Sequence, residues 1–319
     1  MESIIDKLRI GVSSCLLGHK VRYDGQHKQD SYITDILGQY AEFVPVCPET
    51  ECGLPVPREA MHLTGDIDRP RLVTIRSGID LTDKMKKWAA VKLDMLEKEK
   101  LCGFIFKSKS PSSGRYHVKV YPANGIPVKQ GTGIFAAALV ERFPLLPVEE
   151  EGRLNDRVLR ENFIDKIMVF GRWREYEEHD GSMPGLLDFH SRHKYMLMAH
   201  SPESVTAIGQ IAASYNRRNL NEIRTRYLEG LMKTLDYKVT SKKNRNVMMH
   251  LMGYFKKNLS SAEKLELLEL MDHYVDGLLP LLAPLTMLRH YSRKYDCEFL
   301  QNQYYLNPSS AELNLKYHL

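Results

Sequence analysis

Three short apolar runs near the start of the chain each end in a loop that carries cysteine or serine. Residues 8–14 lead into Cys15, residues 42–46 lead into Cys47, and residues 101–106 lead into the serine- and lysine-rich segment 107–114. Short apolar runs of this kind are typical of strands buried inside a sheet. The sequence therefore predicts three buried strands, each followed by a polar loop.

Helical patterns lie between these runs and after them, at residues 30–40, 82–100 and 134–142. The last pattern follows Gly131-Thr132-Gly133, a glycine turn that is a weak signal for phosphate binding. Strands that alternate with helices predict a parallel sheet, and ligands bind beyond the carboxyl ends of the strands in such sheets. We therefore expect the three polar loops to form a binding site.

Two prolines and the acidic triplet 149–151 interrupt this pattern at residues 144–151, which predicts a linker. Beyond it the chain consists mostly of long helical patterns. These cover residues 155–171, 183–199, 202–215, 220–235, 243–257, 262–276 and 284–295. We predict an α/β N-terminal domain at residues 1–148, with a parallel sheet and flanking helices, and an all-α C-terminal domain at residues 149–319.

Composition places the chain among soluble globular proteins, with 43% hydrophobic and 27% charged residues. The most apolar stretch, residues 275–288, is shorter than a bilayer span and contains Asp276, and the first residues lack the apolar core of a signal peptide. We expect a cytoplasmic protein with no membrane partner. Its five cysteines suit metal binding or catalysis better than a disulfide framework.

Thiolates contributed by separate loops suit an iron-sulfur cluster or zinc. The chain has no pair of cysteines with the spacing of a zinc finger. From the residues alone a second interpretation stays open, in which Cys15 and Cys47 are small, buried apolar residues at strand ends.

Five ordered motifs resemble the thiouracil desulfidase family, often called TudS. They are Ser-Ser-Cys-Leu-Leu-Gly at 13–18, Arg-Tyr-Asp-Gly at 22–25, Cys-Pro-Glu at 47–49, Gly-Leu-Pro-Val-Pro-Arg at 53–58 and Lys-Ser-Lys-Ser-Pro-Ser at 107–112. The C-terminal half, at residues 250–256 and 284–291, resembles the domain fused to it in the bacterial tRNA 4-thiouridine desulfidases called RudS.

The resemblance implies a 4Fe-4S cluster held by three cysteines, with one iron open to bind the sulfur of a thiolated pyrimidine. Water then replaces that sulfur hydrolytically. The implied function is a tRNA 4-thiouridine desulfidase whose partner is tRNA containing 4-thiouridine. Two alternatives stay open: a desulfidase of free thiopyrimidines such as thiouracil, and a non-catalytic RNA-binding protein with a decayed cluster site.

Residue by residue, Cys15 and Cys47 match the first two cluster ligands of the family, and Ser113 stands where the third cysteine is expected. A serine hydroxyl is a harder and far less acidic ligand than a thiol, so we expect a weakly held or absent cluster. Either a cysteine has been replaced by serine in an engineered variant, or the natural protein has lost or altered its cluster. Cys52 and Cys102 are possible substitute ligands.

Glu49 matches the catalytic carboxylate of the family, and Ser110 matches its active-site serine. The plainer explanations are that Glu49 pairs with Arg58 or caps a backbone amide, and that Ser110 belongs to an ordinary turn. Ser13 and Ser112 are further candidates for substrate contact, and Lys107 and Lys109 for contact with substrate phosphate. The motif residues Arg22, Asp24 and Arg58 are expected to brace the loops through ion pairs.

The C-terminal half carries a basic run with no carboxylate between Asp236 and Glu263. Its candidate RNA-contacting residues are Lys242, Lys243, Arg245, Tyr254 and Lys256. Basic side chains bind phosphate, and aromatic rings stack on unpaired bases. The alternative is a solvated helical face whose aromatic residues belong to the core.

Overall fold

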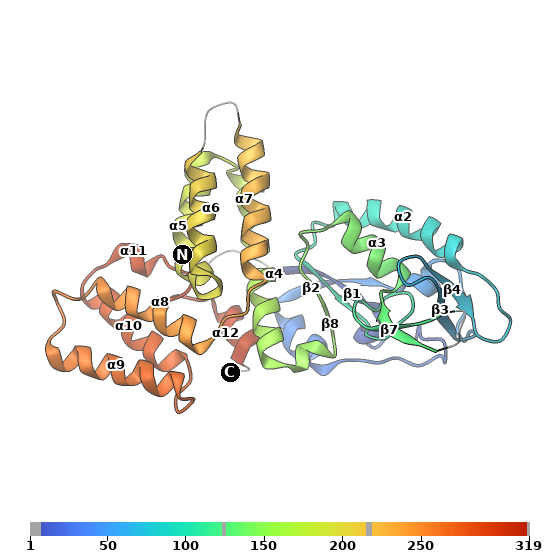
Figure 1. Ribbon diagram of the computed structural model, residues 1–319, viewed down its shortest axis with the longest axis horizontal. Coiled ribbons are helices and arrows are strands. Elements are labelled where there is room, and N and C mark those ends of the chain that lie inside the picture. The colour runs from blue at the N-terminus through green and yellow to red at the C-terminus, as the bar shows by residue number, and fades with distance from the viewer. Residues whose placement is uncertain (1–7, 123–125, 215–218, 318–319) are drawn as a thin grey trace. The chain divides into compact units, whose positions relative to one another are not determined.

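The computed structural model describes residues 8–122, 126–214 and 219–317 (Figure 1). By their internal contacts these residues form two units. The sheet unit contains the described residues up to Arg172 together with residues 314–317, and the helical unit is Trp173–Leu313. The long helix α4 (Arg157–His179) contributes residues to both. The ranges 1–148 and 149–319 stay a prediction about domain organisation.

Sheet A of the sheet unit is parallel, as predicted. Its strands are β1 (Leu8–Ser13), β2 (Ala41–Val46), β5 (Gly103–Phe106) and β8 (Val148–Glu150), in the order β2-β1-β5-β8. Ser13 lies opposite Val46, and Val12 lies opposite Ile105. The carboxyl ends of the strands therefore meet at one edge of the sheet.

Both faces of sheet A are covered at β1 and β5, which explains why these two strands read as mostly apolar runs. All four residues of β5 are buried, and successive side chains point to opposite faces. Phe104 and Phe106 pack against Phe135, at centroid distances of 5.9 and 6.4 Å. Ile105 belongs to the apolar cluster on the opposite side.

Within the sheet unit, α2 (Thr82–Lys98) and α3 (Ile134–Arg142) lie side by side and form one helical layer (Figure 1). Both agree with the predicted patterns. The pattern at residues 30–40 forms a π turn (η2, Tyr32–Ile36) followed by a 3-10 turn (η3, Leu37–Gln39) rather than one regular helix. Two shorter turns follow β1 and β2, namely η1 (Ser14–Leu17) and α1 (Pro48–Glu51).

A second, mixed sheet was not predicted from the sequence. It contains β3 (Met61–Gly65), β4 (Pro70–Thr74), β6 (Val118–Tyr121) and β7 (Val128–Gly131), in the order β4-β3-β6-β7. The β3–β4 and β6–β7 pairs are antiparallel, and β3–β6 is parallel. One face of this sheet carries a buried apolar cluster, which includes Leu63, Leu72 and Val120. Its strands therefore alternate apolar and polar residues over a few positions only.

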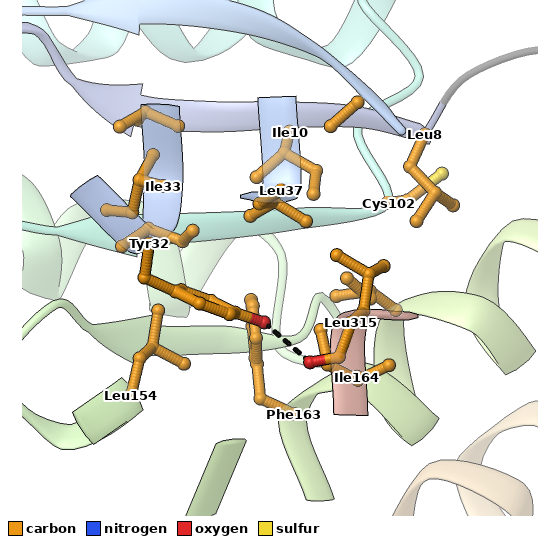
Figure 2. Packing of buried hydrophobic residues seen from close by; sticks show 14 of the residues in the cluster. Leu8, Ile10, Tyr32, Ile33, Leu37, Cys102, Leu154, Phe163, Ile164 and Leu315 are labelled. Carbon is orange, nitrogen blue, oxygen red and sulfur yellow. Dashed lines mark hydrogen bonds between the residues drawn. The ribbon is translucent and has the colours of Figure 1, made fainter. Parts of the chain in front are cut away.

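The end of the chain packs into the sheet unit. Leu315, on α12 (Ser310–Tyr317), is fully buried among residues of β1, η2 and α4 (Figure 2). The hydroxyl of Tyr32 donates to the backbone oxygen of Leu315 at 3.2 Å. Lys316 also pairs with Asp165 of α4. These contacts join residues far apart in sequence into one core.

The helical unit is all-α in its described residues, as predicted. Besides α4, α11 (Glu298–Gln301) and α12, its helices are α5 (Met183–His200), α6 (Pro202–Ala213), α7 (Leu220–Leu235), α8 (Ser241–Gly253), α9 (Ser261–Val275) and α10 (Leu282–Lys294). Four of the helices α5 to α10 begin where a hydroxyl accepts a backbone N–H three residues on, which satisfies a donor that the first turn leaves free. These capping residues are Ser182, Ser201, Thr240 and Ser260. None of the described helices is both long and apolar enough to cross a bilayer.

Replacing Leu315 by alanine should lower the free energy of unfolding by about 2–5 kcal/mol, because it leaves a cavity in the core of the sheet unit. Denaturant unfolding measures this change. The control is Met95→Ala, which removes a side chain that is 55% exposed on α2 and should change the free energy by less than about 0.5 kcal/mol. Equal stability of the two variants would show that α12 does not belong to this core.

Candidate active site

Loops from three strand ends converge on one pocket of about 410 Å³. Cys15 lies in η1, directly after β1, and Cys47 lies after β2, directly before α1. Residues 107–114, called the serine loop below, follow β5. The structure brings together every site residue predicted in the first half of the chain. Those lining the pocket are Ser13, Cys15, Cys47, Glu49, Lys107, Lys109, Ser110, Ser112 and Ser113.

At the three positions that were predicted to hold a cluster, the donor atoms are two thiols and one hydroxyl, from Cys15, Cys47 and Ser113. Burial raises the pKa of the Cys15 thiol to about 11, and the nearby charge of Lys107 opposes this rise. Ser113 is also buried, and its hydroxyl makes no hydrogen bond within the described part of the chain. In placement the three residues fit a shared group, since each comes from a different loop around one pocket.

In chemistry the fit is incomplete, because Ser113 supplies a hard, weakly acidic oxygen in place of a soft thiolate. Among the described residues no group of three or more His, Cys, Asp or Glu side chains is arranged to hold a metal ion. Neither Cys52 nor Cys102 lines the pocket, and the Cys52 thiol donates to the backbone oxygen of Glu49 at 3.3 Å. Neither cysteine therefore compensates for Ser113 in this arrangement.

Glu49 is held by a buried arginine and by the serine loop. Arg58 donates through Nε to Oε2 of Glu49 at 2.9 Å, and its Nη2 contacts the same oxygen. The other oxygen, Oε1, accepts the hydroxyl of Ser112 at 2.7 Å. The Ser112 hydroxyl also lies 3.0 Å from that of Ser110. A continuous chain of hydrogen bonds therefore joins Ser110 to the Glu49 carboxylate.

Arg58 does more than pair with Glu49. Its guanidinium donates to the backbone oxygens of Val21, at 2.9 Å, and Pro55, at 3.3 Å. Its own N–H donates to the backbone oxygen of Tyr23 at 2.8 Å. The bracing role expected of Arg58 is therefore visible in these contacts, which join the loop after β1 to the turn after β2.

The acidic triplet 149–151 was predicted to be part of a linker, and this prediction is wrong. Glu149 and Glu150 lie in β8, the edge strand of sheet A, and Glu150 and Glu151 hold the serine loop. Glu151 accepts the backbone N–H of Ser108 at 2.7 Å and pairs with Lys107. Glu150 accepts the backbone N–H groups of Arg115 and Tyr116, at 2.7 and 3.0 Å. Both ends of the loop are thereby fixed. Burial raises the pKa of Glu150, while these two backbone hydrogen bonds oppose the rise.

The two lysines of this loop differ in their surroundings. The ammonium group of Lys107 donates to the backbone oxygen and the hydroxyl of Ser108, both at 3.1 Å, and pairs with Glu151. Lys109 is exposed and has a left-handed backbone, with φ of 60°. A contact with substrate phosphate stays a prediction for both residues, but only Lys109 presents an exposed side chain.

The glycine turn before α3 uses its backbone N–H groups to hold the serine loop. Gly133 donates to the oxygen of Gly114 at 2.7 Å, and Phe135 donates to the oxygen of Ser112 at 2.9 Å. A Cβ atom at Gly133 would lie only 2.5 Å from the carbonyl carbon of Ser112. Glycine is thus required by a close backbone approach, and these amides point to the loop rather than to a phosphate.

The RNA candidates belong to the helical unit and have unlike surroundings. Lys243 donates to the backbone oxygens of His200 and Lys238, at 2.6 and 2.9 Å, and Arg245 pairs with Asp272 at 2.7 Å. Lys242 and Lys256 are exposed.

Tyr254 is 46% exposed and stacks on Phe299 at a centroid distance of 5.7 Å. The neighbouring Phe255 is 1% exposed and belongs to the core. The exposed members of the predicted set are therefore Lys242, Tyr254 and Lys256.

Sequence reasoning missed the contribution of Glu150 and Glu151, because an acidic triplet after two prolines is typical of a linker. The one available signal was the β-branched residue Val148, which begins β8. No role was predicted from the sequence for Tyr23, which lines the pocket.

Two known protein families match separate parts of the chain. The family described as 2-thiouracil desulfurase matches residues 10–151, and a family described as a protein of unknown function, DUF1722, matches residues 194–310. The first match contains every residue that lines the pocket, and the second contains the basic run.

Two curated relatives are uncharacterized proteins. YbgA of Escherichia coli (strain K12) is 31% identical over 153 residues, which cover 48% of this chain and 90% of YbgA. YbbK of Bacillus subtilis (strain 168) is 30% identical over 150 residues, which cover 46% of this chain and 97% of YbbK. A solved structure, described as a 4Fe-4S-dependent thiouracil desulfidase named TudS, is 34% identical and covers 47% of this chain and 95% of that chain, with a TM-score of 0.39.

Replacing Gly133 by alanine should displace the serine loop and lower the free energy of unfolding by about 1–3 kcal/mol, because the added Cβ meets backbone atoms that cannot move separately. The matched control is Gly152→Ala in the same unit, where φ is −64° and the nearest atom to an added Cβ lies 3.9 Å away. Denaturant unfolding compares the two. If Gly133→Ala is as stable as Gly152→Ala, α3 does not hold the loop as described.

Proposed function

The chain belongs to the 2-thiouracil desulfurase family, and we propose that its pocket is that of an enzyme which removes the sulfur of a thiolated pyrimidine, with 4-thiouridine in tRNA as the substrate. Ser113, in place of a third soft ligand, limits this activity in the chain as it stands. The observation that carries this proposal is the convergence of Cys15, Cys47 and position 113 on one pocket beside Glu49. A pocket of about 410 Å³ lies within the range usual for small-molecule sites. A single base can enter it only when it is exposed from the RNA fold.

The reaction exchanges a thiocarbonyl for a carbonyl. Water attacks the ring carbon, the carbon–sulfur bond breaks, and the products are the pyrimidine carbonyl and hydrogen sulfide. No electrons are gained or lost, so the reaction needs no external oxidant or reductant. A 4Fe-4S cluster held at Cys15, Cys47 and position 113 would supply a soft, open iron for the sulfur atom.

Ser110, Ser112 and Glu49 offer a path for the proton that the attacking water releases. Ser110 lines the pocket, and its hydroxyl is joined through Ser112 to Oε1 of Glu49. A proton released from the attacking water at Ser110 can therefore reach the carboxylate through these two hydroxyls. Arg58 occupies the other oxygen, which fixes the carboxylate in the orientation that accepts the Ser112 hydrogen bond.

The choice of tRNA over a free base is supported by the helical unit. Its exposed Lys242 and Lys256 and its half-exposed Tyr254 offer the two kinds of contact that RNA makes, with phosphate and with unpaired bases. We assign the reaction to the cytoplasm, where thiols stay reduced.

Replacing Ser113 by cysteine should restore a cluster and desulfuration, because it completes a set of three soft ligands. Both proteins are supplied anaerobically with iron and sulfide, and visible absorbance and bound iron are measured. They are then incubated with tRNA containing 4-thiouridine and, separately, with free 4-thiouracil, and the products are analysed. We expect cluster absorbance and uridine formation in the variant, and little of either in the parent chain.

The double variant Ser113→Cys, Glu49→Gln separates cluster binding from chemistry. It should keep the cluster absorbance and lose about 10²–10⁴-fold in rate, since an amide accepts no proton. Desulfuration of free 4-thiouracil alone would replace the tRNA assignment by the free-base one. Absence of cluster and product in Ser113→Cys would overturn the enzymatic proposal.

Replacing Lys242 and Lys256 together by alanine should weaken tRNA binding and reduce the salt dependence of the binding constant by about two units of slope, if each lysine meets one phosphate. Filter binding at several salt concentrations measures this. The control removes equal charge from α2 of the sheet unit through Lys86→Ala with Lys87→Ala, and should leave the slope unchanged. If the salt dependence of binding is unaltered in the Lys242 and Lys256 variant, these two lysines do not belong to the RNA interface.

A further inference from the structure

Tyr23 is the one aromatic residue among the described residues that line the pocket. Tyr23 is 45% exposed, whereas Ser112 and Ser113, which line the same pocket, are buried. The other lining residues are aliphatic, hydroxyl-bearing, charged or cysteine. A pyrimidine ring that enters the pocket therefore meets a single flat, apolar surface of matching size, and this surface belongs to Tyr23.

The backbone of Tyr23 is fixed although its ring is exposed. Its carbonyl accepts the N–H of Arg58 at 2.8 Å, which joins it to the residue that pairs with Glu49. The turn that carries it is closed by two backbone hydrogen bonds, from Gly25 to Arg22 at 3.0 Å and from Arg22 to Gln26 at 3.2 Å. Gly25 permits this turn, with φ of 75°. The ring is thus presented by a rigid turn.

Arg22 reinforces the same surface. Its guanidinium carbon lies 5.7 Å from the centroid of the Tyr23 ring, and Arg22 itself lines the pocket. Two hydrogen bonds of 3.4 Å to Asp24 hold the guanidinium in place. Aromatic rings and guanidinium planes are the two side-chain surfaces on which bases stack.

We infer that Tyr23 is the side chain on which the pyrimidine ring of the substrate stacks. This inference rests on the proposed function, because it requires that a thiolated pyrimidine enters this pocket. Stacking engages the face of the ring and not its exocyclic atom. Tyr23 therefore holds the thiolated base and its oxygen-containing product alike, and the discrimination between sulfur and oxygen belongs to other groups of the pocket.

The test measures binding without turnover. Equilibrium dialysis of 4-thiouracil and of uracil is carried out with the parent chain and with Tyr23→Ala, Tyr23→Phe and Tyr237→Ala. Tyr237 is a matched control, since it is 49% exposed and lies in the helical unit. We expect Tyr23→Ala to weaken the binding of both bases by about 5- to 100-fold, and Tyr23→Phe and Tyr237→Ala to change it by less than about 2-fold.

A second readout uses the Ser113→Cys background. There Tyr23→Ala should raise KM with little change in kcat and with unaltered cluster absorbance, because stacking binds substrate and product without taking part in the chemistry. Desulfuration by Ser113→Cys without any effect of Tyr23→Ala on binding or KM would overturn the stacking role while leaving the proposed function intact. Absence of saturable binding to the parent chain, or loss of 4-thiouracil binding with uracil binding retained, would also overturn it.

Discussion

The parallel register of β1, β2 and β5 is the constraint on which the rest of the site depends. With these strands side by side, Cys15, Cys47 and the serine loop leave the sheet at the same edge. The hydroxyl of Ser13 strengthens this alignment where it matters, since it accepts the N–H of Lys107 at 2.9 Å and so ties the end of β1 to the end of β5. A slip of one residue would turn the β5 side chains to the opposite faces of the sheet and carry the loop away from the cysteines.

Around this edge the chain places several buried charges, each satisfied by hydrogen bonds. Glu49 is paired with Arg58 and Ser112, Glu151 with Lys107 and Ser108, and Glu150 with two backbone amides. Buried carboxylates are tolerated only with such partners, and breaking one pair leaves an uncompensated charge in a poorly solvated place. The network therefore holds the serine loop in one position. In the proposed function the network acts through that position, not through direct contact of every member with the substrate.

Much of this architecture could be predicted from the sequence, and the exceptions have physical causes. The strands β1, β2 and β5 of sheet A gave apolar runs, whereas β8 (Val-Glu-Glu) gave none, and the helical unit gave long periodic patterns. The second sheet was missed because Met61–Gly65 and Pro70–Thr74 are short, polar on one face and separated by charged residues. Within the site, the motifs identified which residues meet, but the Ser112–Glu49 hydrogen bond and the anchoring by Glu150 and Glu151 depend on tertiary contacts between residues 34–63 positions apart. No local pattern carries that information.

We expect that the pocket, once Ser113→Cys supplies a third thiolate, would hold a 4Fe-4S cluster with one iron open to the sulfur of a thiolated base. Mössbauer spectroscopy of the reconstituted Ser113→Cys protein, recorded with and without 4-thiouracil, measures this. One iron of the cluster should differ from the others, and its signal alone should change when 4-thiouracil is added. Unchanged signals from every iron, under conditions where dialysis shows the base to be bound, would rule out binding of the sulfur to the cluster.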